Sequence, residues 1–207
     1  LASSNREPRF AIEKRAVGSL VLVVSPSQAV ATARPLPRQI ETRAIAAGVR
    51  LTGSDLAQAT DKGTAVHEAL RILLCRPDLR GRVSQHCRVS AAEVELLAQQ
   101  AQALRQTLAE LGYTRLHIEQ PIELELADGG RQSIIVDLIA EGTDGFMIVD
   151  HKSGPVADHA ARFESYWPQL AAYIDAVEFK AGKAVRSAAV FWTETGELTL
   201  GQVLCGT

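Results

Sequence analysis

Two apolar runs joined by a short glycine-containing turn constrain the fold of this chain more than any other feature. The runs extend from Ser133 to Glu141 and from Phe146 to Lys152, and the residues between them are Gly-Thr-Asp-Gly. Runs of this composition on either side of a tight turn are typical of a β-hairpin. We therefore predict two neighbouring antiparallel strands whose side chains are largely buried.

Each of these apolar strands contains an aspartate. If the turn has a two-residue loop, Asp137 lies directly opposite Asp150 in the ladder, and such partners have Cβ atoms about 4.5–5.5 Å apart. Lys152 lies two residues after Asp150 and therefore points to the same face. Buried carboxylates this close repel each other unless a cation lies between them. A salt-bridge cluster around Lys152 is one such arrangement, but one lysine neutralises only part of the charge, so we favour a bound Mg²⁺.

The segments before and after this hairpin have the periodicity of helices and further strands. Apolar residues recur at helical spacing in three segments, and Pro168 is expected in the first turn of the last one, where its missing amide would have no intrahelical partner. The predicted helices span residues 60–76, 90–111 and 165–180, and the additional strands span residues 116–126, 184–193 and 197–203. This order predicts an α/β fold with a mixed central sheet flanked by helices.

The N-terminal part of the chain has a weaker pattern. An apolar run at residues 17–24 predicts one strand, and a short helix is predicted over residues 25–33. Prolines follow, and the rest of this part has no clear periodicity. We therefore predict an N-terminal arm and connector over residues 1–59 and one domain over residues 60–207.

The composition is that of a soluble globular protein. Hydrophobic residues make up 46% of the chain and charged residues 22%. The N-terminal apolar run is too short to span a membrane, and acidic residues precede it, unlike in a secretory leader. Three widely spaced cysteines fit neither a disulfide framework nor a zinc pattern, so we expect a reducing, cytoplasmic location. With a net charge of −2, a DNA-binding protein would need a local basic surface or a partner that holds the DNA.

Three further polar residues gain significance only beside the hairpin. His67 lies in the first predicted helix, where a single histidine is usually structural or exposed to solvent. Gln169 and Tyr173 lie four residues apart and share one face of the last predicted helix. A polar stripe on an amphipathic helix is one interpretation of this pair. Hydrogen bonding to a phosphate or to a catalytic side chain is the other.

Taken in order, these segments resemble the RecB-type nucleases of the PD-(D/E)XK superfamily, most closely the C-terminal domains of the bacterial RecB and AddA helicase–nucleases. Five short motifs between about residues 60 and 175 carry the resemblance. They are Gly63-Thr64-x-x-His67-x-x-Leu70, Glu119 to Ile122, Ile135-Val-Asp137, Asp150-His-Lys152-Ser-Gly154 and Gln169-x-x-x-Tyr173. Each motif alone is weak, but five in the family's order are specific.

The resemblance implies a restriction-endonuclease-like core and a metal-dependent DNA nuclease, with exonuclease action expected. It implies that His67, Asp137 and Asp150 bind Mg²⁺ or Mn²⁺ together with the backbone carbonyl of His151. The ion would lower the pKa of the attacking water and polarise the scissile phosphate.

The resemblance also implies roles for three more residues and for partners of the chain. Lys152 would orient the attacking water or help deprotonate it, and would stabilise charge on the phosphate, while Gln169 and Tyr173 would steady the site or the DNA. The expected partners are DNA, a helicase motor domain on the same chain and a second subunit. In such an assembly the domain would act in DNA end processing and double-strand break repair.

Some positions depart from the family pattern. His151 and Ser153 stand where the family usually has tyrosine and threonine, and the glycine that often precedes Asp137 is missing. No cysteine cluster follows Tyr173, so no iron–sulfur cluster is expected. Two alternatives stay open: a stand-alone phage-type or restriction-like nuclease, and an inactive nuclease fold that serves as a DNA-binding scaffold. We favour an active nuclease over the inactive scaffold. Degenerate domains usually lose the metal carboxylates or the lysine, and this chain retains them.

Overall fold

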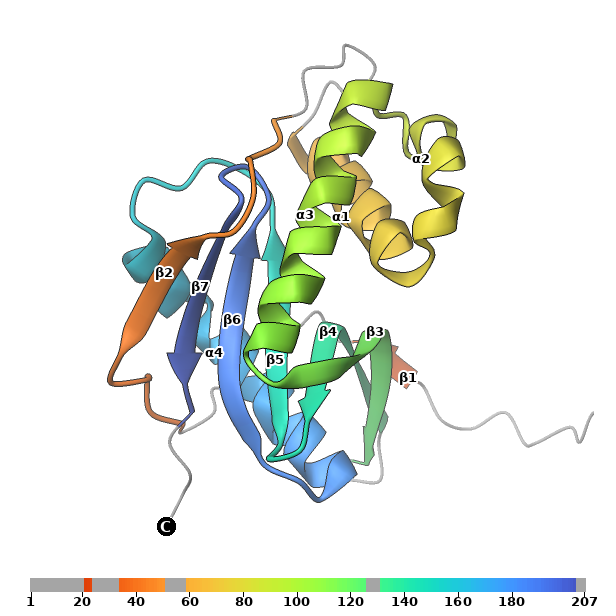
Figure 1. Ribbon diagram of the computed structural model, residues 1–207. Helices are drawn as coiled ribbons and strands as arrows, with labels where there is room; N and C mark the ends of the chain where they lie inside the picture. The colour runs from red at the N-terminus through yellow and green to blue at the C-terminus, as the bar shows by residue number, and fades with distance from the viewer. Residues whose placement is uncertain (1–20, 24–33, 51–58, 126–130, 204–207) are drawn as a thin grey trace, which may run out of the picture.

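The described residues form a mixed sheet of seven strands (Figure 1). The computed structural model describes residues 21–23, 34–50, 59–125 and 131–203. The strands are β1 (Val21–Val23), β2 (Ile40–Ala44), β3 (Tyr113–Glu125), β4 (Arg131–Gly142), β5 (Phe146–Lys152), β6 (Val185–Trp192) and β7 (Glu197–Gln202). Their order across the sheet is β1-β4-β5-β6-β7-β2, and β3 pairs with β4 outside this path.

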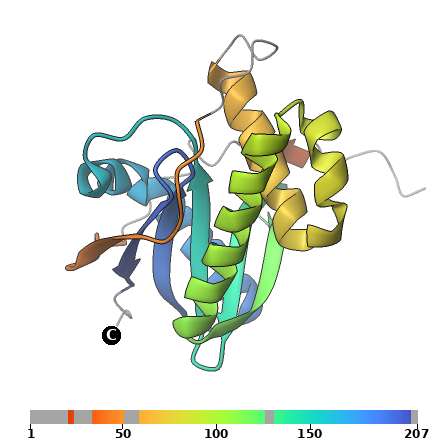
Figure 2. The same ribbon diagram turned by 45° about the horizontal axis from the view of Figure 1, so that its top comes forward.

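Helices cover both faces of this sheet, so the predicted α/β class is confirmed. They are α1 (Ala59–Cys75), α2 (Arg80–Cys87), α3 (Ala91–Glu110) and α4 (His159–Ala181), with a short 3-10 helix, η2 (Pro77–Leu79), before α2. Helices α1 and α3 lie on one face with α2 packed against them, and α4 lies on the other face (Figures 1 and 2). No helix in the described part of the chain is long and apolar enough to cross a membrane.

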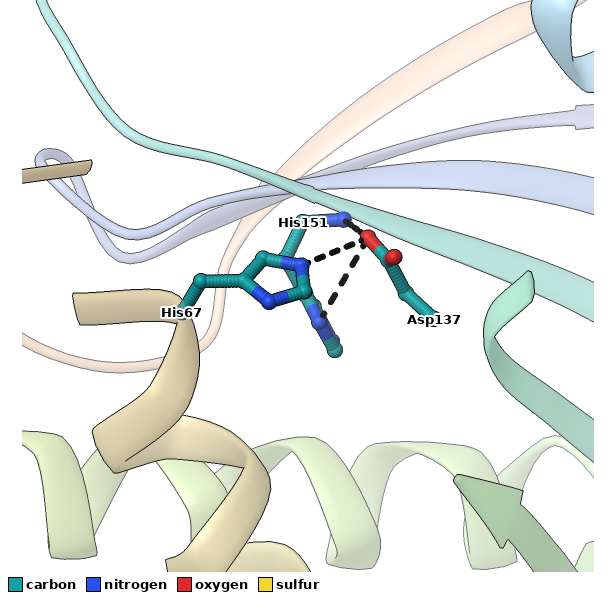
Figure 3. Close-up of side chains that lie close together, drawn as sticks. All are labelled: His67, Asp137 and His151. Atoms are coloured by element: carbon teal, nitrogen blue, oxygen red, sulfur yellow. Dashed lines mark hydrogen bonds and ion pairs between the residues drawn. The ribbon is translucent and has the colours of Figure 1, made fainter. Parts of the chain in front are cut away.

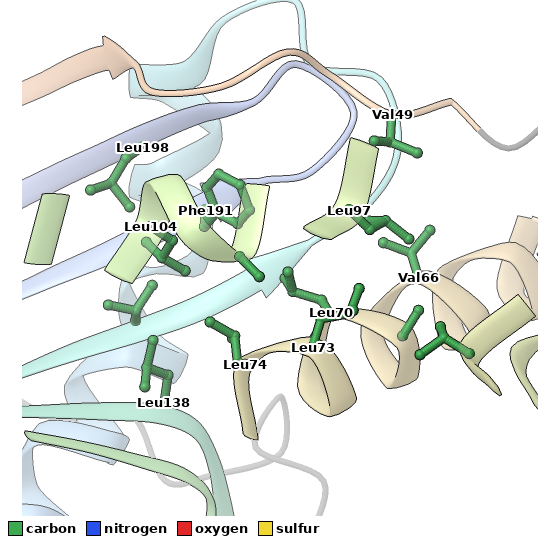
Figure 4. Packing of buried hydrophobic residues seen from close by; sticks show 14 of the residues in the cluster. Val49, Val66, Leu70, Leu73, Leu74, Leu97, Leu104, Leu138, Phe191 and Leu198 are labelled. Carbon is green, nitrogen blue, oxygen red and sulfur yellow. The ribbon is translucent and has the colours of Figure 1, made fainter. Parts of the chain in front are cut away.

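Two hydrophobic cores hold these layers together. One lies between the sheet and helices α1 and α3 (Figure 4), where Leu70, Leu104 and Leu138 are each 0% exposed. The other lies between the sheet and α4 and includes Phe163 and Trp192. Because both faces of the central strands are covered, β5 is buried along almost its whole length, and its first four residues are apolar without alternating with polar ones.

Helix α3 begins with a pair of reciprocal hydrogen bonds. The Ser90 hydroxyl accepts a hydrogen bond from the Glu93 amide, and the Glu93 carboxylate accepts one from the Ser90 amide. This capping box satisfies two amides that would otherwise have no partner at the helix start. The observed start matches the predicted one at residue 90 within one position.

Helix α4 begins earlier than the sequence pattern predicts. The Asp158 side chain accepts a hydrogen bond from the backbone of the first turn, so the helix starts at His159 and not at Ser165. Pro168 therefore lies inside the helix, and the prediction that it occupies the first turn is wrong. Glu164 and Pro168 are both exposed, so the carbonyl that loses its amide partner at the proline can be hydrated.

The hairpin of β4 and β5 has the predicted turn. The Gly142 amide donates a hydrogen bond to the Gly145 carbonyl over 2.9 Å, which confirms the two-residue loop. The ladder then pairs Leu138 with Val149, and the same register sets Asp137 across from Asp150 at the next position.

Strands β4 and β5 separate at that position. Their ladder ends with Leu138 opposite Val149, whereas β5 continues beside β6 as far as Lys152. Strand β3 occupies the other edge of β4 along its length, and β1 pairs with the beginning of β4. Asp137 and Asp150 therefore lie at a fork between two diverging strands, which we call the β4–β5 fork.

Some elements differ from the predictions or lie outside the described residues. Neither α2 nor β2, which pairs with β7, is predicted from the sequence. Strand β1 is the described part of the strand predicted at residues 17–24, and the helix predicted over residues 25–33 lies outside the described residues.

Candidate active site

The Asp137 carboxylate occupies the β4–β5 fork. The His151 amide donates a hydrogen bond to Asp137 Oδ2 over 2.9 Å. His151 is past the last ladder pair of β4 and β5, so the side chain of Asp137 provides the acceptor that the diverging backbone of β4 does not. This bond fixes the carboxylate next to His151.

Helix α1 brings His67 to the same carboxylate (Figure 3). His67 Nε2 lies 3.0 Å from Asp137 Oδ2. Gly63 lies one turn earlier on α1, and a Cβ atom built there would meet Ser153 Oγ at 2.9 Å. The lack of a side chain at Gly63 therefore lets the start of α1 approach the residue that follows β5. The Gly-x-x-x-His spacing thus serves the packing that positions His67.

His67 and Asp137 each change the pKa of the other. The hydrogen bond to Asp137 raises the pKa of His67 above its ordinary value, although burial opposes the shift. Burial alone would raise the pKa of Asp137, but its hydrogen bond with His67 and the nearby imidazole charges outweigh burial and lower the pKa to about 2. Without a metal, the two groups therefore form an ion pair.

Asp150 makes its contacts on the α4 side of the fork. Gln169 Nε2 donates hydrogen bonds to Asp150 Oδ1 over 3.0 Å and to the Tyr173 hydroxyl over 2.8 Å. Gln169 Oε1 accepts a hydrogen bond from Lys152 Nζ over 3.4 Å. Gln169 and Tyr173 thus share one face of α4, as their spacing predicts, and Gln169 connects Asp150 with Lys152.

One oxygen of Asp150 has no hydrogen-bond donor among the described residues. Asp150 is 1% exposed, and its Oδ2 lies 2.6 Å from Lys152 Nζ in an ion pair that lacks the angles of a hydrogen bond. Burial and the charge of Asp137 raise the pKa of Asp150 to about 7, although Lys152 opposes this. A buried carboxylate oxygen in this state is costly unless a cation binds it.

The contacts of the predicted charged residues are divided between two sides of the fork. Asp137 contacts His67 of α1, whereas Asp150 and Lys152 contact Gln169 of α4. The two carboxylates still interact, since the charge of Asp137 contributes to the raised pKa of Asp150. The fork therefore brings together every side chain predicted for the site, but not in a single row on one face.

The His151 side chain lies on the α1 side, next to Asp137. Its Nδ1 is 3.9 Å from Asp137 Oδ2, and its ring makes edge contacts with His67 and with Phe191, at centroid distances of 5.7 and 6.1 Å. Burial lowers the pKa of His151 to about 4. The family motif implies a role only for the backbone carbonyl of this residue, so its side chain was not among the predicted ligands.

Two other neighbours of the site are absent from the predicted site residues. Lys152 Nζ lies over the Tyr166 ring, 4.8 Å from its centroid. Glu119 has a φ of 47°, which is uncommon outside glycine, and its Oε1 lies 3.9 Å from His67 Nδ1. The i, i+3, i+7 spacing of Tyr166, Gln169 and Tyr173 on one helix could have identified Tyr166 from the sequence.

An open cleft of about 560 Å³ gives access to the α1 side of the site. Its lining includes Gly63, His67, Glu119, His151 and Lys152. A larger hollow of about 720 Å³ lies beside the β4–β5 turn, at the other end of β5, and none of the predicted site residues lines it. Of these two hollows, only the smaller cleft is lined by predicted site residues.

Comparison with known protein families matches residues 41–201 to the PD-(D/E)XK nuclease superfamily. The chain belongs to this superfamily. The matched region extends from β2 to β7 and contains the whole β4–β5 fork. Members of the PD-(D/E)XK superfamily are generally nucleases that use divalent metals.

Other comparisons add little to this assignment. No curated protein matches the chain. A solved structure described as "Crystal structure of SSO0001" shares 14% sequence identity, covers 72% of this chain and 80% of that chain, and has a TM-score of 0.31.

The residues of this member of the PD-(D/E)XK nuclease superfamily fit a divalent metal. Ligand atoms of His67, Asp137 and His151 lie within 4.8 Å of one another. On the other side of the fork, Asp150 Oδ2 is a buried anionic oxygen without a hydrogen-bond donor among the described residues. Carboxylate oxygens are suitable donors for Mg²⁺ and Mn²⁺, and imidazole nitrogens are suitable donors for transition ions.

Proposed function

We propose that this chain is a metal-dependent nuclease that hydrolyses phosphodiester bonds in DNA. The observation that supports this most is the buried Asp150 carboxylate, which lies beside a second carboxylate, Asp137, at the β4–β5 fork with only Lys152 as a cationic partner among the described residues. In this proposal His67, Asp137 and Asp150 hold the ion, and the backbone carbonyl of His151 is a further ligand. Mg²⁺ and Mn²⁺ are both candidates.

The bound ion would supply Lewis acidity that polarises the phosphate and favours deprotonation of the attacking water. Lys152 lies at the open cleft beside Asp150, so its ammonium group can orient the water and stabilise negative charge that develops on the phosphate. Gln169 is hydrogen-bonded to both Asp150 and Lys152, and Tyr173 is hydrogen-bonded to Gln169. These two residues keep the catalytic groups in a fixed arrangement.

Exposed basic residues of the α2 region support DNA as the substrate. Arg82 and Arg88 of the α2 region are exposed and form no ion pair with any described residue. His86 of the same helix lies 3.4 Å from Glu68, which lines the cleft beside His67. The α2 region can therefore contact the phosphates of DNA that leads into the cleft, although the chain has a net charge of −2.

We infer further that this nuclease belongs to a helicase–nuclease that processes DNA ends. The support is the order and spacing of the five motifs, which resemble those of RecB and AddA. A motor domain on the same chain, together with a second subunit, would supply most of the affinity for DNA. A stand-alone nuclease is the competing proposal.

The first test is cleavage of end-labelled single- and double-stranded DNA with Mg²⁺, Mn²⁺ or EDTA. We expect metal-dependent cutting that EDTA abolishes and that Lys152→Ala lowers by at least about 10²-fold, because one preorganised charge is worth a few kcal/mol in the transition state. Lys180→Ala is the matched control, since Lys180 is exposed at the end of α4. Lack of both cutting and metal binding would contradict the proposal and leave the DNA-binding scaffold.

The type of DNA substrate distinguishes the two nuclease proposals. An end-processing nuclease is expected to cut linear DNA and to leave covalently closed circles intact. A restriction-like enzyme is expected to cut both. If the wild type binds metal but does not cut linear DNA, dependence on a motor domain is supported, and adding that domain must restore cleavage.

The α2 surface leads to a separate prediction on DNA affinity. We expect the double variant Arg82→Gln, Arg88→Gln to bind a labelled oligonucleotide less tightly and to reduce the slope of log K against log salt by about 0.9 for each lost phosphate contact. The matched control is Arg38→Gln with Lys180→Gln, which removes two exposed charges outside α2. Equal effects of the two double variants would show that α2 has no special role in DNA binding.

A further inference from the structure

The side chain of His151 occupies a position that the proposed role of its backbone does not explain. Asp150 and His151 are neighbours on β5, so their side chains point to opposite faces of the sheet. Asp150 reaches Gln169 on the α4 side, while the His151 ring lies on the α1 side beside Asp137 and His67 (Figure 3). One strand thus presents a candidate ligand to each side of the fork.

The distances around Asp137 suit a shared ion. Two ligand atoms that are each bound at about 2.1 Å to one ion can be at most about 4.2 Å apart. His67 Nε2 and His151 Nδ1 lie 3.0 and 3.9 Å from Asp137 Oδ2, within this limit. Ligand atoms of all three residues lie within 4.8 Å of one another, so a small movement of one ring would complete the set.

The His151 ring also has an unsatisfied polar atom. The residue is 6% exposed, and its Nε2 is buried without a hydrogen-bond partner in the described part of the chain. Buried imidazole nitrogens are normally paired with a protein group or a water. The opposite ring nitrogen faces Asp137 at 3.9 Å, which is beyond a hydrogen bond. Hydrogen bonding among the described residues therefore does not account for the position of this ring.

The geometry points to the His151 imidazole as a metal ligand that, with His67 and Asp137, makes a site selective for a first-row transition ion such as Mn²⁺ over Mg²⁺. Imidazole nitrogen binds first-row transition ions, Mn²⁺ least strongly among them, whereas Mg²⁺ prefers an all-oxygen shell. A site with one imidazole is compatible with Mg²⁺, but a second imidazole shifts the preference toward the transition ion. This inference rests on the proposed function, because it concerns the ion of the same site.

Metal binding measured by calorimetry tests the inference without any cleavage assay. We expect the wild type to bind Mn²⁺ at least about 10-fold more tightly than Mg²⁺. The variant His151→Phe retains an aromatic ring against Phe191 but lacks nitrogen, and it should lose at least about 10-fold in Mn²⁺ affinity while its Mg²⁺ affinity changes less than about 3-fold. The control His117→Phe removes an imidazole on β3 that pairs with Glu141 of β4, and it should leave both affinities unchanged.

The nitrogen ligands of bound Mn²⁺ provide a second readout, by pulsed electron paramagnetic resonance. Two coordinated imidazoles are expected in the wild type and one in His151→Phe, with circular dichroism confirming that the variant is folded. One imidazole in both proteins, with equal Mn²⁺ affinity, would overturn the inference and leave the proposed nuclease intact. Failure of the wild type to bind any divalent ion would overturn both.

Discussion

Asp150→Asn is expected to abolish cleavage and at the same time to stabilise the metal-free protein. The substitution removes an anionic ligand from the proposed metal site, and we expect a rate loss of at least about 10³-fold, which corresponds to about 4 kcal/mol in the activation barrier. The same carboxylate is 1% exposed and has an oxygen without a hydrogen-bond donor among the described residues. Burial and the charge of Asp137 outweigh the attraction of Lys152, so the charge of Asp150 destabilises the folded protein when no metal is bound.

The sign of the stability effect follows from the pKa of Asp150. Burial and the charge of Asp137 raise this pKa from 3.8 to about 7 in the folded protein. A carboxyl with a raised pKa binds more protons in the folded than in the unfolded state. Its contribution to the free energy of unfolding therefore increases as the pH falls from about 7 toward 4, and is least favourable above pH 7. Asparagine removes this penalty at every pH.

Thermal unfolding in EDTA at pH 8 and pH 5 measures the effect. We expect the melting temperature of Asp150→Asn to exceed that of the wild type by a few degrees at pH 8, since 1 kcal/mol corresponds to about 2–4 °C at this chain length. The difference should be smaller at pH 5, and it should vanish only below about pH 4, where the carboxyl is protonated in the unfolded state as well. Asp144→Asn, in the exposed turn, is the matched control. A variant that is less stable at pH 8 would show that Lys152 already compensates the charge of Asp150.

The hairpin that carries the site could be predicted from the sequence because its register depends on local features. Two glycines fix the turn. A shift of the strand register by one residue would move the side chains of one strand to the opposite face of the sheet. The Gly142–Gly145 hydrogen bond and the ladder from Leu138 confirm that register. The approach of Asp137 and Asp150 at the fork follows from it.

The elements that could not be predicted from the sequence have few buried residues of their own. In α2 only Val83 and Cys87 are buried, and the other residues of the helix are exposed except Ser84, which is half-exposed. Strand β2 is an edge strand without a fully buried residue. Their positions depend on packing against α1 and α3 and on pairing with β7, which periodicity alone does not reveal.

The environment of the site depends on contacts between distant segments. The separation of β4 from β5 directs Asp137 toward α1 while Asp150 faces α4, and a ladder extended from sequence does not show this divergence. The meeting of His151 with His67 requires the approach of α1 that Gly63 permits. Strand alternation indicates that the side chain of His151 faces away from that of Asp150, but not what it meets there.

Leu70→Ala is expected to lower the stability of the protein more than any of the substitutions at the site. Leu70 is 0% exposed in the core between α1, α3 and the sheet, and it lies one turn after His67 (Figure 4). Truncation of such a leucine costs about 2–5 kcal/mol, because it loses apolar burial and leaves a cavity. The melting temperature should therefore fall by about 5–15 °C.

Chemical denaturation of Leu70→Ala, with and without Mn²⁺, measures how this core is linked to the site. Leu111→Ala, at a leucine that is 37% exposed, is the matched control and should cost less than about 1 kcal/mol. Because an ion that binds only the folded state stabilises it, saturating Mn²⁺ should raise the stability of both variants by similar amounts. If Mn²⁺ failed to stabilise Leu70→Ala, the core under α1, and not the β4–β5 fork alone, would be needed to hold His67 at the metal site.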